Sequence, residues 1–378
     1  MPTTAPAPAP APNQPRTLSY EIAQTQTDVQ RGLVRAVMPI VIVVAVAFLM
    51  HRVIGPWVGN YQVRIMLDTG VAIIAAVSLN IVNGYTGQFS IGHAAFMAIG
   101  GYVAGFITYY GSLRIWGDYV ARPGIAHLQE WMFAGACIVG GLFAAATGWV
   151  VGLPSLRLRG DYLAIVTLGF GEIVRVLLQQ TERQYFTAEE ANAIPLRKLI
   201  FPPAVGGAQG FSDIPKLSNL FWMYLFVGIT VLFAYRLKQS SYGRAMLSIR
   251  EDEIAAEAMG VNVTRLKVRA FIFAAFFAGV AGALYAHQQG NLLRPIDAGF
   301  QRSFDVVIMV VLGGLGSISG AVLAAIIITV LQALLLGFAQ YRMIIFALML
   351  ILLMIFRPKG LFGVREIWDF FPRQKDHR

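Results

Sequence analysis

Charged residues are scarce in this sequence of 378 residues. Only 13% of the residues are Asp, Glu, Lys or Arg, whereas 57% are hydrophobic, and soluble domains usually carry roughly 25% charged residues. Because one hydrophobic core stops growing at about 250–300 residues, a chain of this composition in water would expose large apolar patches. The composition excludes a soluble domain and indicates a membrane protein.

Cysteine is almost absent as well. Cys137 is the single cysteine, so the chain cannot form an internal disulfide or a cysteine-based zinc site. We interpret Cys137, which lies in an apolar run, as a small packing residue. The sequence also lacks the His-Glu-x-x-His, Gly-x-Ser-x-Gly and phosphate-loop motifs that mark metalloproteases, hydrolases and nucleotide-binding proteins. These absences predict no enzymatic activity and no cofactor in this chain.

The N-terminal stretch has no apolar run. Residues 1–30 begin with alternating Ala and Pro, which cannot bury enough surface to offset the entropy lost on ordering. This stretch also lacks the short basic start and immediate apolar core of a signal peptide. We expect a retained, disordered Ala/Pro-rich tail on the cytoplasmic side.

Long apolar runs fill most of the remaining chain, residues 31–362. A helix needs about 20 apolar residues to cross a bilayer core of roughly 30 Å. The pattern predicts an all-α, polytopic membrane domain with about ten transmembrane segments. These are roughly 34–54, 62–82, 89–110, 131–153, 162–179, 218–236, 268–287, 303–315, 317–337 and 340–356.

The segment 303–315 is short, reaching only about 18 Å as a helix. It runs into the glycine-rich stretch Gly313–Gly320, which is too rich in glycine to continue as a strong helix. We therefore predict a break near Gly313–Gly320. Two explanations stay open: a half-helix whose irregular backbone faces the protein interior, or a tight turn between full spans at the membrane surface.

Basic residues indicate the orientation in the membrane. They concentrate before the first span, in the loop 237–267 and in a C-terminal tail, 363–378, and such segments favour the cytoplasm. Ten crossings would place both termini there, and six would place the loop 237–267 there too. The external loop 180–217 also carries basic residues, although the rule weakens far from helix ends. The net charge of +10 thus reflects topology rather than nucleic-acid binding.

Small and polar residues are frequent in the apolar stretch 83–105. This stretch is therefore a candidate translocation path. Close backbone packing between helices is the alternative explanation, and both stay open. The charged residues within predicted spans, Asp68, Glu172, Arg175 and Asp305, are functional candidates by default, although Glu172 and Arg175 can neutralise each other one turn apart. The candidate path residues are Asn83, Gln88, Ser90, Gly92 and His93, together with Gly313, Gly314 and Gly316 at the predicted break.

The loop 237–267 contains a pattern typical of a short amphipathic helix. Acidic residues 251–253 precede an apolar face formed by Ile254, Ala255, Ala258 and Met259, and acids are favourable near a helix N-terminus. Gly260 is placed to end the helix. This apolar face either enters a groove on a partner protein or lies on the membrane surface.

Four motifs carry a resemblance to a known family. Arg250-Glu-Asp-Glu-Ile-Ala-Ala-Glu-Ala-Met-Gly260 resembles the coupling-loop motif of ABC-importer permeases. The stretch from Leu156 to Arg175, which begins Leu-Arg-Leu-Arg-Gly-Asp-Tyr, is similar to the LivM-type permeases of branched-chain amino acid ABC importers. Gly84-Tyr-Thr-Gly-Gln-Phe-Ser-Ile-Gly-His93 and Leu312-Gly-Gly-Leu-Gly-Ser-Ile-Ser-Gly320 match that family too. The resemblance extends from about residue 62 to residue 362.

The resemblance implies a bacterial inner-membrane permease that forms half of an alternating-access path for leucine, isoleucine or valine. Its expected partners are a LivH-type second permease, two ABC ATPases that bind ATP and Mg, and a periplasmic binding protein. The residues expected to couple to the ATPases are Arg250, Glu251, Glu253, Ala255, Ala256 and Gly260. Two rival functions stay open: a sister importer for urea, short amides or other amino acids, and a stand-alone proton-coupled transporter.

Overall fold

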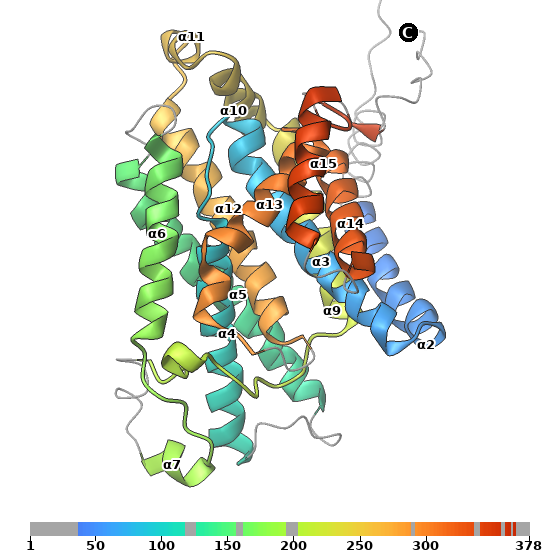
Figure 1. The fold of residues 1–378 in the computed structure, drawn as a ribbon, viewed down its shortest axis with the longest axis vertical. Coiled ribbons are helices and arrows are strands. Elements are labelled where there is room, and N and C mark those ends of the chain that lie inside the picture. Colours follow the sequence, from blue (N-terminus) through green and yellow to red (C-terminus); the bar gives the residue numbers. More distant parts are fainter. Residues whose placement is uncertain are drawn as a thin grey trace, which may run out of the picture.

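The computed structural model describes residues 37–117, 126–155, 162–193, 203–288, 292–335, 341–356, 360–363 and 366–367. These residues form an all-helical bundle (Figure 1), with an isolated antiparallel bridge between Phe211 and Leu293. The predicted N-terminal tail and most of the C-terminal tail lie outside the described residues, as does the Leu156–Gly160 part of the motif similar to LivM-type permeases.

Within the described residues, seven helices are long and apolar enough to cross a membrane. Each overlaps one predicted span, which confirms the polytopic all-α fold. Three further helices match the remaining predicted segments but are shorter, so the count of about ten spans stays a prediction. The seven are Val37–Trp57, α3 (Asn60–Asn80), α4 (His93–Trp116), α5 (Ala126–Ser155), α6 (Tyr162–Gln179), α9 (Leu220–Gln239) and α12 (Val263–Ala286). The three are α13 (Phe300–Gly313), α14 (Ile318–Leu334) and α15 (Arg342–Phe356).

Helices α4, α5 and α12 pack most closely, because small residues face one another where they cross. A Cβ on Gly100 of α4 would collide with the backbone of Gly279 of α12, and one on Gly282 would collide with Met97. Close backbone approach of this kind is how helices associate in lipid, where a hydrophobic driving force between them is missing. Cys137 of α5 is fully buried here, which confirms its packing role.

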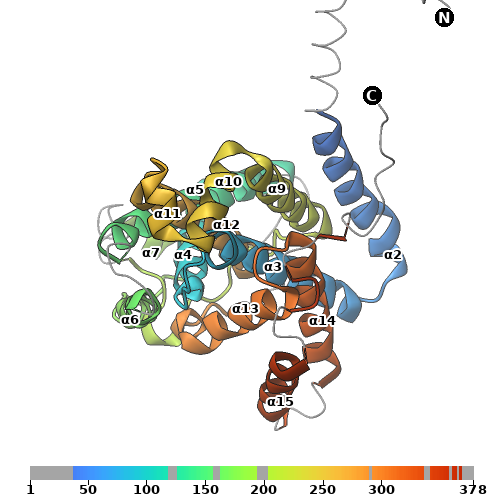
Figure 2. The same cartoon turned by 90° about the horizontal axis from the view of Figure 1, so that it is seen from above.

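Helix α3 occupies the middle of the bundle, with α9, α12, α13 and α14 around it (Figure 2). It continues into η2 (Ile81–Tyr85), a wider helical turn. The chain then runs without helix from Thr86 to Gly92 before α4 begins. Wide turns of this kind interrupt the regular hydrogen-bond ladder, so α3 ends in a break beside α10 (Ser241–Glu251).

A second break separates α13 from α14, as the sequence predicted. Helix α13 ends at Gly313, and Gly314 and Gly316 adopt φ values of +108° and +86°, a region that favours glycine. The hydroxyl oxygen of Ser317 then accepts a hydrogen bond from the Gly320 N–H over 3.1 Å and caps α14. The chain thus reverses direction within a few residues, and α13, with 14 residues, reaches about 21 Å.

Two ends of the bundle can be distinguished in Figure 1. Helices α10 and α11 (Glu253–Ala258) stand at the top, which we name the α10 end. The short helix α7 (Ala188–Ala193) stands at the bottom, which we name the α7 end. The predicted loop 180–217 forms the α7 end over its described residues, and both helix breaks lie toward the α10 end.

Candidate functional site

The two helix breaks meet through the side chain of Asn80. Its Oδ1 accepts a hydrogen bond from the Gly316 N–H over 2.8 Å, and its Nδ2 donates to the Ser317 carbonyl oxygen over 3.0 Å. A Cβ on Gly84 would lie 2.5 Å from the Gly316 nitrogen, so the two backbones touch. We call Asn80, Gly84, Gly316 and Ser317 the break junction. Its buried amide supplies the backbone partners that the broken helices lack.

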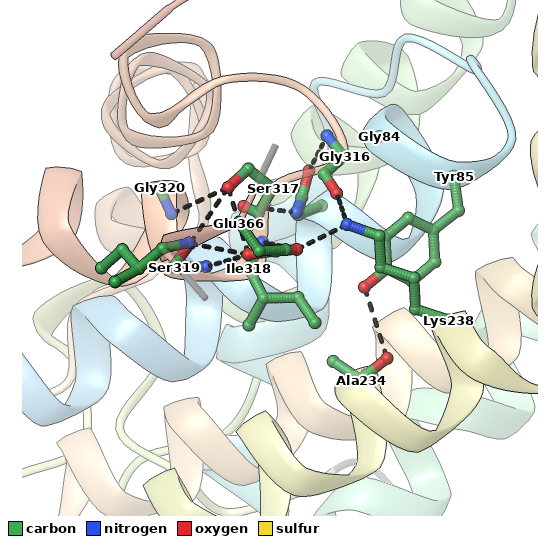
Figure 3. Close-up of polar contacts among 12 residues, drawn as sticks. Gly84, Tyr85, Ala234, Lys238, Gly316, Ser317, Ile318, Ser319, Gly320 and Glu366 are labelled. Carbon is green, nitrogen blue, oxygen red and sulfur yellow. Dashed lines mark hydrogen bonds and ion pairs between the residues drawn. The ribbon is translucent and has the colours of Figure 1, made fainter. Parts of the chain in front are cut away.

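Glu366 fixes the N-terminus of α14 (Figure 3). Its carboxylate accepts hydrogen bonds from the Ile318 and Ser319 N–H groups, both over 3.0 Å, and from the Ser319 hydroxyl over 2.6 Å. The side chain is buried, with 3% exposed. A helix N-terminus stabilises negative charge because its first N–H groups point at the ligand. The sequence pattern places Glu366 in the predicted C-terminal tail and does not predict this role.

Lys238, near the end of α9, connects Glu366 to the break junction. Its Nζ donates to the Gly316 carbonyl oxygen over 2.7 Å and to a carboxylate oxygen of Glu366 over 2.5 Å. Burial alone would raise the pKa of Glu366, but the hydrogen bonds from Lys238, Ser319 and the α14 backbone outweigh it and lower the pKa. Glu366 is therefore charged in the folded protein at neutral pH.

Arg250 connects α10 to both helix breaks. Its Nη1 donates to the carbonyl oxygen of Gly84 over 2.9 Å and to that of Leu315 over 3.3 Å. The aliphatic part of the side chain lies against Gly87, where a Cβ would be 3.1 Å from Arg250 Cγ. Charge-assisted bonds to backbone oxygens are stronger than neutral ones, so α10 is tied to α3 and α13 at one point.

The amphipathic helix predicted after residue 250 is α11, and its ends form as predicted. Asp252 caps it, because its Oδ1 accepts from the Ile254 and Ala255 N–H groups over 2.9 and 3.0 Å. Gly260, with a φ of +82°, follows its end. Ile254 and Met259 are 72% and 84% exposed, so the apolar face has no partner within the described chain.

The six predicted coupling residues divide into two groups. Arg250, Glu253 and Ala256 face this chain: Glu253 accepts a hydrogen bond from Lys267 of α12 over 2.7 Å, and Ala256 is buried. The other three, Glu251, Ala255 and Gly260, are exposed. The helix can therefore present one side to another protein while the opposite side stays attached to α10 and α12.

The eight predicted path residues all lie in or beside the two breaks. Asn83 Oδ1 accepts from the Ser90 N–H over 3.3 Å, and the ring of His93 bonds the Ser78 hydroxyl over 2.8 Å. His93 is thus a buried, hydrogen-bonded packing residue. Every member is packed against protein, and their role in transport stays a prediction. The remaining six are Gln88, Gly92, Gly313, Gly314, Gly316 and Ser90.

A cavity of about 330 Å³ lies between α3, α12, α13 and α14, away from the predicted path residues. Charged side chains line it: Arg64 and Asp68 from α3, and Arg302 and Asp305 from α13. The sequence singled out Asp68 and Asp305, but both arginines were missed. The signal that could have found them is their spacing, since each arginine precedes an aspartate by about one helical turn. Glu172 and Arg175, by contrast, pair with each other over 2.6 Å.

The chain is similar to known transport proteins. Residues 61–356 match the family described as the permease component of the branched-chain amino acid transport system. The chain is 37% identical to the high-affinity branched-chain amino acid transport system permease protein LivM of Escherichia coli K12, covering 84% of this chain and 73% of that protein. It is 36% identical to LivM of Salmonella typhimurium, covering 85% and 73%.

A more distant relative is LivH, a permease protein of the same kind of transport system. The LivH protein of Salmonella typhimurium is 26% identical over 309 residues, covering 80% of this chain and 94% of that protein. No solved structure matches the chain. The family match spans both helix breaks, α10, α11 and the charged cavity. The chain therefore belongs to the permease-component family of branched-chain amino acid transport systems.

Proposed function

We propose that this chain is a membrane-spanning permease subunit of an ATP-driven importer and forms half of the path for leucine, isoleucine and valine. The family membership and the two LivM proteins support this function. The observation that carries it is the position of Arg250, which links α10, the helix that leads into the exposed α11, to both helix breaks. A permease driven by separate ATPases needs such a mechanical connection between its surface and its membrane helices.

The α10 end faces the cytoplasm in this proposal, and the α7 end faces the periplasm. Both termini are cytoplasmic, in the bacterial inner membrane. The basic loop 237–267 supports this orientation through the positive-inside rule. The partners are a LivH-type second permease, two ABC ATPases that bind ATP and Mg, and a periplasmic binding protein that meets the α7 end. This chain itself holds no cofactor.

Helix α11 docks in a groove on an ATPase subunit. Ile254 and Met259 project into that groove, because large exposed apolar side chains favour a hydrophobic partner surface. Movement of the ATPase shifts α11 and, through the Asp252 cap, α10. Arg250 then pulls on the carbonyl oxygens of Gly84 and Leu315. The C-terminal ends of α3 and α13 therefore move at the same time.

The break junction and its neighbours act as the cytoplasmic gate. Asn83, Gln88, Ser90, Gly92 and His93 belong to one side of it, and Gly313, Gly314 and Gly316 to the other. Their close packing supports a closed gate at this end. Opening requires separating Gly84 from Gly316, which the shared contact with Arg250 can drive.

Reconstitution tests the proposal. The complete importer is placed in proteoliposomes with ATP on the ATPase side and leucine-loaded binding protein on the other. We expect leucine uptake that requires ATP and the binding protein. Uptake of urea or short amides instead would favour the sister importers. Uptake by this chain alone, driven by a pH gradient without ATPases, would overturn the proposal in favour of a proton-coupled transporter.

A further inference from the structure

The cavity between α3, α12, α13 and α14 has a charged end and an apolar end, and we name it the charged chamber. Its volume of about 330 Å³ falls in the range of small-molecule sites. Tyr61 of α3 donates from its hydroxyl to the Ala333 carbonyl oxygen of α14 over 3.2 Å and joins two of the walls. Both residues line the chamber. Helices α3 and α14 are thus joined beside the chamber.

Among the described residues, two arginines and two aspartates line the charged end, and their formal charges cancel. Arg64 and Asp68 are one turn apart on α3, and Arg302 and Asp305 are one turn apart on α13. Charged side chains within the membrane are expensive, and those that occur usually face a cavity with a function. Arg64 and Arg302 both lie close enough to Asp68 to interact electrostatically. Charges of both signs therefore meet around one open space.

Two of these side chains are held in position by neighbours. Asp68 accepts a hydrogen bond from the buried amide of Gln288 over 2.9 Å. The guanidinium of Arg302 lies 5.3 Å from the ring centre of Tyr285 on α12, a cation–π distance. A carboxylate and a guanidinium with fixed positions on opposite walls form a preorganised pair of charges.

The apolar end lies deeper, toward the break junction. Val71, Ala72 and Ala75 follow Asp68 along α3, and Val306 and Met309 follow Arg302 along α13. Because a helix rises 1.5 Å per residue, Ala75 lies about 10 Å beyond Asp68 in the direction of the junction. Opposite charges at one end and aliphatic walls at the other suit a small solute that carries both a positive and a negative charge and an aliphatic group.

We propose that the charged chamber binds a branched-chain α-amino acid as its zwitterion during transport. The ammonium group pairs with Asp68, assisted by Asp305. The carboxylate pairs with Arg302, assisted by Arg64, and the aliphatic side chain lies against Val71, Ala72 and Met309. The proposal rests on the proposed function and names where the cargo sits. It also explains why a neutral, compact solute such as urea would fit poorly, since urea lacks both charges and the aliphatic group.

Variants Asp68→Asn and Arg302→Gln, with Arg52→Gln as the control, test this site in the reconstituted importer. Arg52 is an exposed arginine outside the chamber, and the proposed function gives it no role. We expect each chamber variant to reduce leucine uptake about tenfold or more, since hydrogen bonds to charged groups contribute that much to binding. Stimulation of ATP hydrolysis by the loaded binding protein should persist, because coupling is intact. The control should transport normally.

Three outcomes distinguish this proposal from the proposed function. If the unmodified importer takes up no leucine, the proposed function fails. If it does, but Asp68→Asn and Arg302→Gln retain uptake, only the chamber proposal is overturned. If these variants lose ATPase stimulation together with uptake, the charges hold the helices together and the chamber proposal is also overturned.

A second measurement does not depend on charge variants that could fail to fold. Thr329 of α14 lines the chamber and is buried, and the native Cys137 is fully buried within the bundle. In the complete importer carrying Thr329→Cys, a small cationic methanethiosulfonate reagent should react with the new thiol. Leucine, but not urea, should slow that reaction. Equal rates with and without leucine would contradict the proposal.

Discussion

The Arg250 guanidinium donates a hydrogen bond to the carbonyl oxygen of Gly84 over 2.9 Å, joining residues that lie 166 positions apart in the chain. Gly84 belongs to the broken end of α3, and Arg250 to the last turn of the helix that leads into α11. The same guanidinium nitrogen reaches Leu315 beside the second break. One side chain therefore contacts both halves of the proposed gate.

Replacing Gly84 with alanine should destabilise the closed junction. A Cβ there would collide with Asn80 Oδ1 and lie 2.5 Å from the Gly316 nitrogen. Overpacking of this kind costs about 1–3 kcal/mol. We expect a lower thermal unfolding midpoint in detergent. The matched control is Gly169→Ala in α6, where a Cβ would have no atom of the described residues within 4 Å. Equal midpoints for the two variants would contradict the close contact at the junction.

The exposed face of α11 should be required for coupling but not for folding. Met259 is 84% exposed, so Met259→Asp leaves the packing of the described residues largely intact, yet it places a charge in the proposed ATPase groove. Gly260→Leu disturbs the turn that follows α11, because Gly260 has a φ of +82°, a conformation that strains a leucine. The added side chain would project into open space at the same surface. We expect both variants to enter the membrane normally and to lose ATP-driven leucine uptake.

Glu257→Gln provides the control for that helix. Glu257 is exposed on α11 but does not belong to its apolar face, so the variant should retain uptake. ATPase subunits should co-purify with Glu257→Gln and not with Met259→Asp. Normal uptake by Met259→Asp would show that α11 does not dock on the ATPase.

The contribution of Glu366 to stability should depend on pH. Its pKa is lowered in the folded protein from an ordinary value of 4.5, so its stabilisation is present above that value and is lost as pH falls through the lower folded value. At neutral pH, Glu366→Gln should reduce the free energy of unfolding by about 1.5–3 kcal/mol, the contribution of hydrogen bonds to a charged group.

Thermal unfolding of the wild type and Glu366→Gln at pH 7 and at pH values below 4 measures this dependence. The difference between the two midpoints should be largest at pH 7 and shrink in acid. A difference that stays constant with pH would mean that the carboxylate charge is not what stabilises the start of α14. Glu257→Gln, at an exposed position, should show no difference at either pH.

Sequence patterns were sufficient for features that depend on neighbouring residues. Long apolar runs located the spanning helices, because each must satisfy its own backbone in lipid. The acids at 251–253 and Gly260 located α11, because capping and termination are decided within a few residues. The glycine-rich stretch after Leu312 located the second break for the same reason. These are local effects, and the structure agrees with each of them.

The contacts that assemble the site could not be predicted from such patterns. Asn80 bonds to Gly316 across 236 positions, and Glu366 bonds to Ile318 from a segment that reads as a polar tail. The charged chamber depends on the packing of α3 against α13, which brings Asp68 near Arg302. Hydrophobic periodicity identifies which face of a helix is buried, but not which other helix packs against that face. These residue pairs can therefore be identified only from the three-dimensional structure.

The most direct test of the account is the effect of Arg250→Ala on transport, compared with Arg244→Ala. Arg244 lies on the same helix but is exposed, and within the described part of the chain it donates hydrogen bonds to Gln239 and Ser241 of its own segment. In the reconstituted importer, Arg250→Ala should reduce leucine uptake about tenfold or more, given the strength of its charge-assisted bonds. Binding-protein stimulation of ATP hydrolysis should fall with it, and Arg244→Ala should behave as the wild type. Uptake by Arg250→Ala equal to that of the wild type would contradict the claim that α10 drives the gate through this side chain.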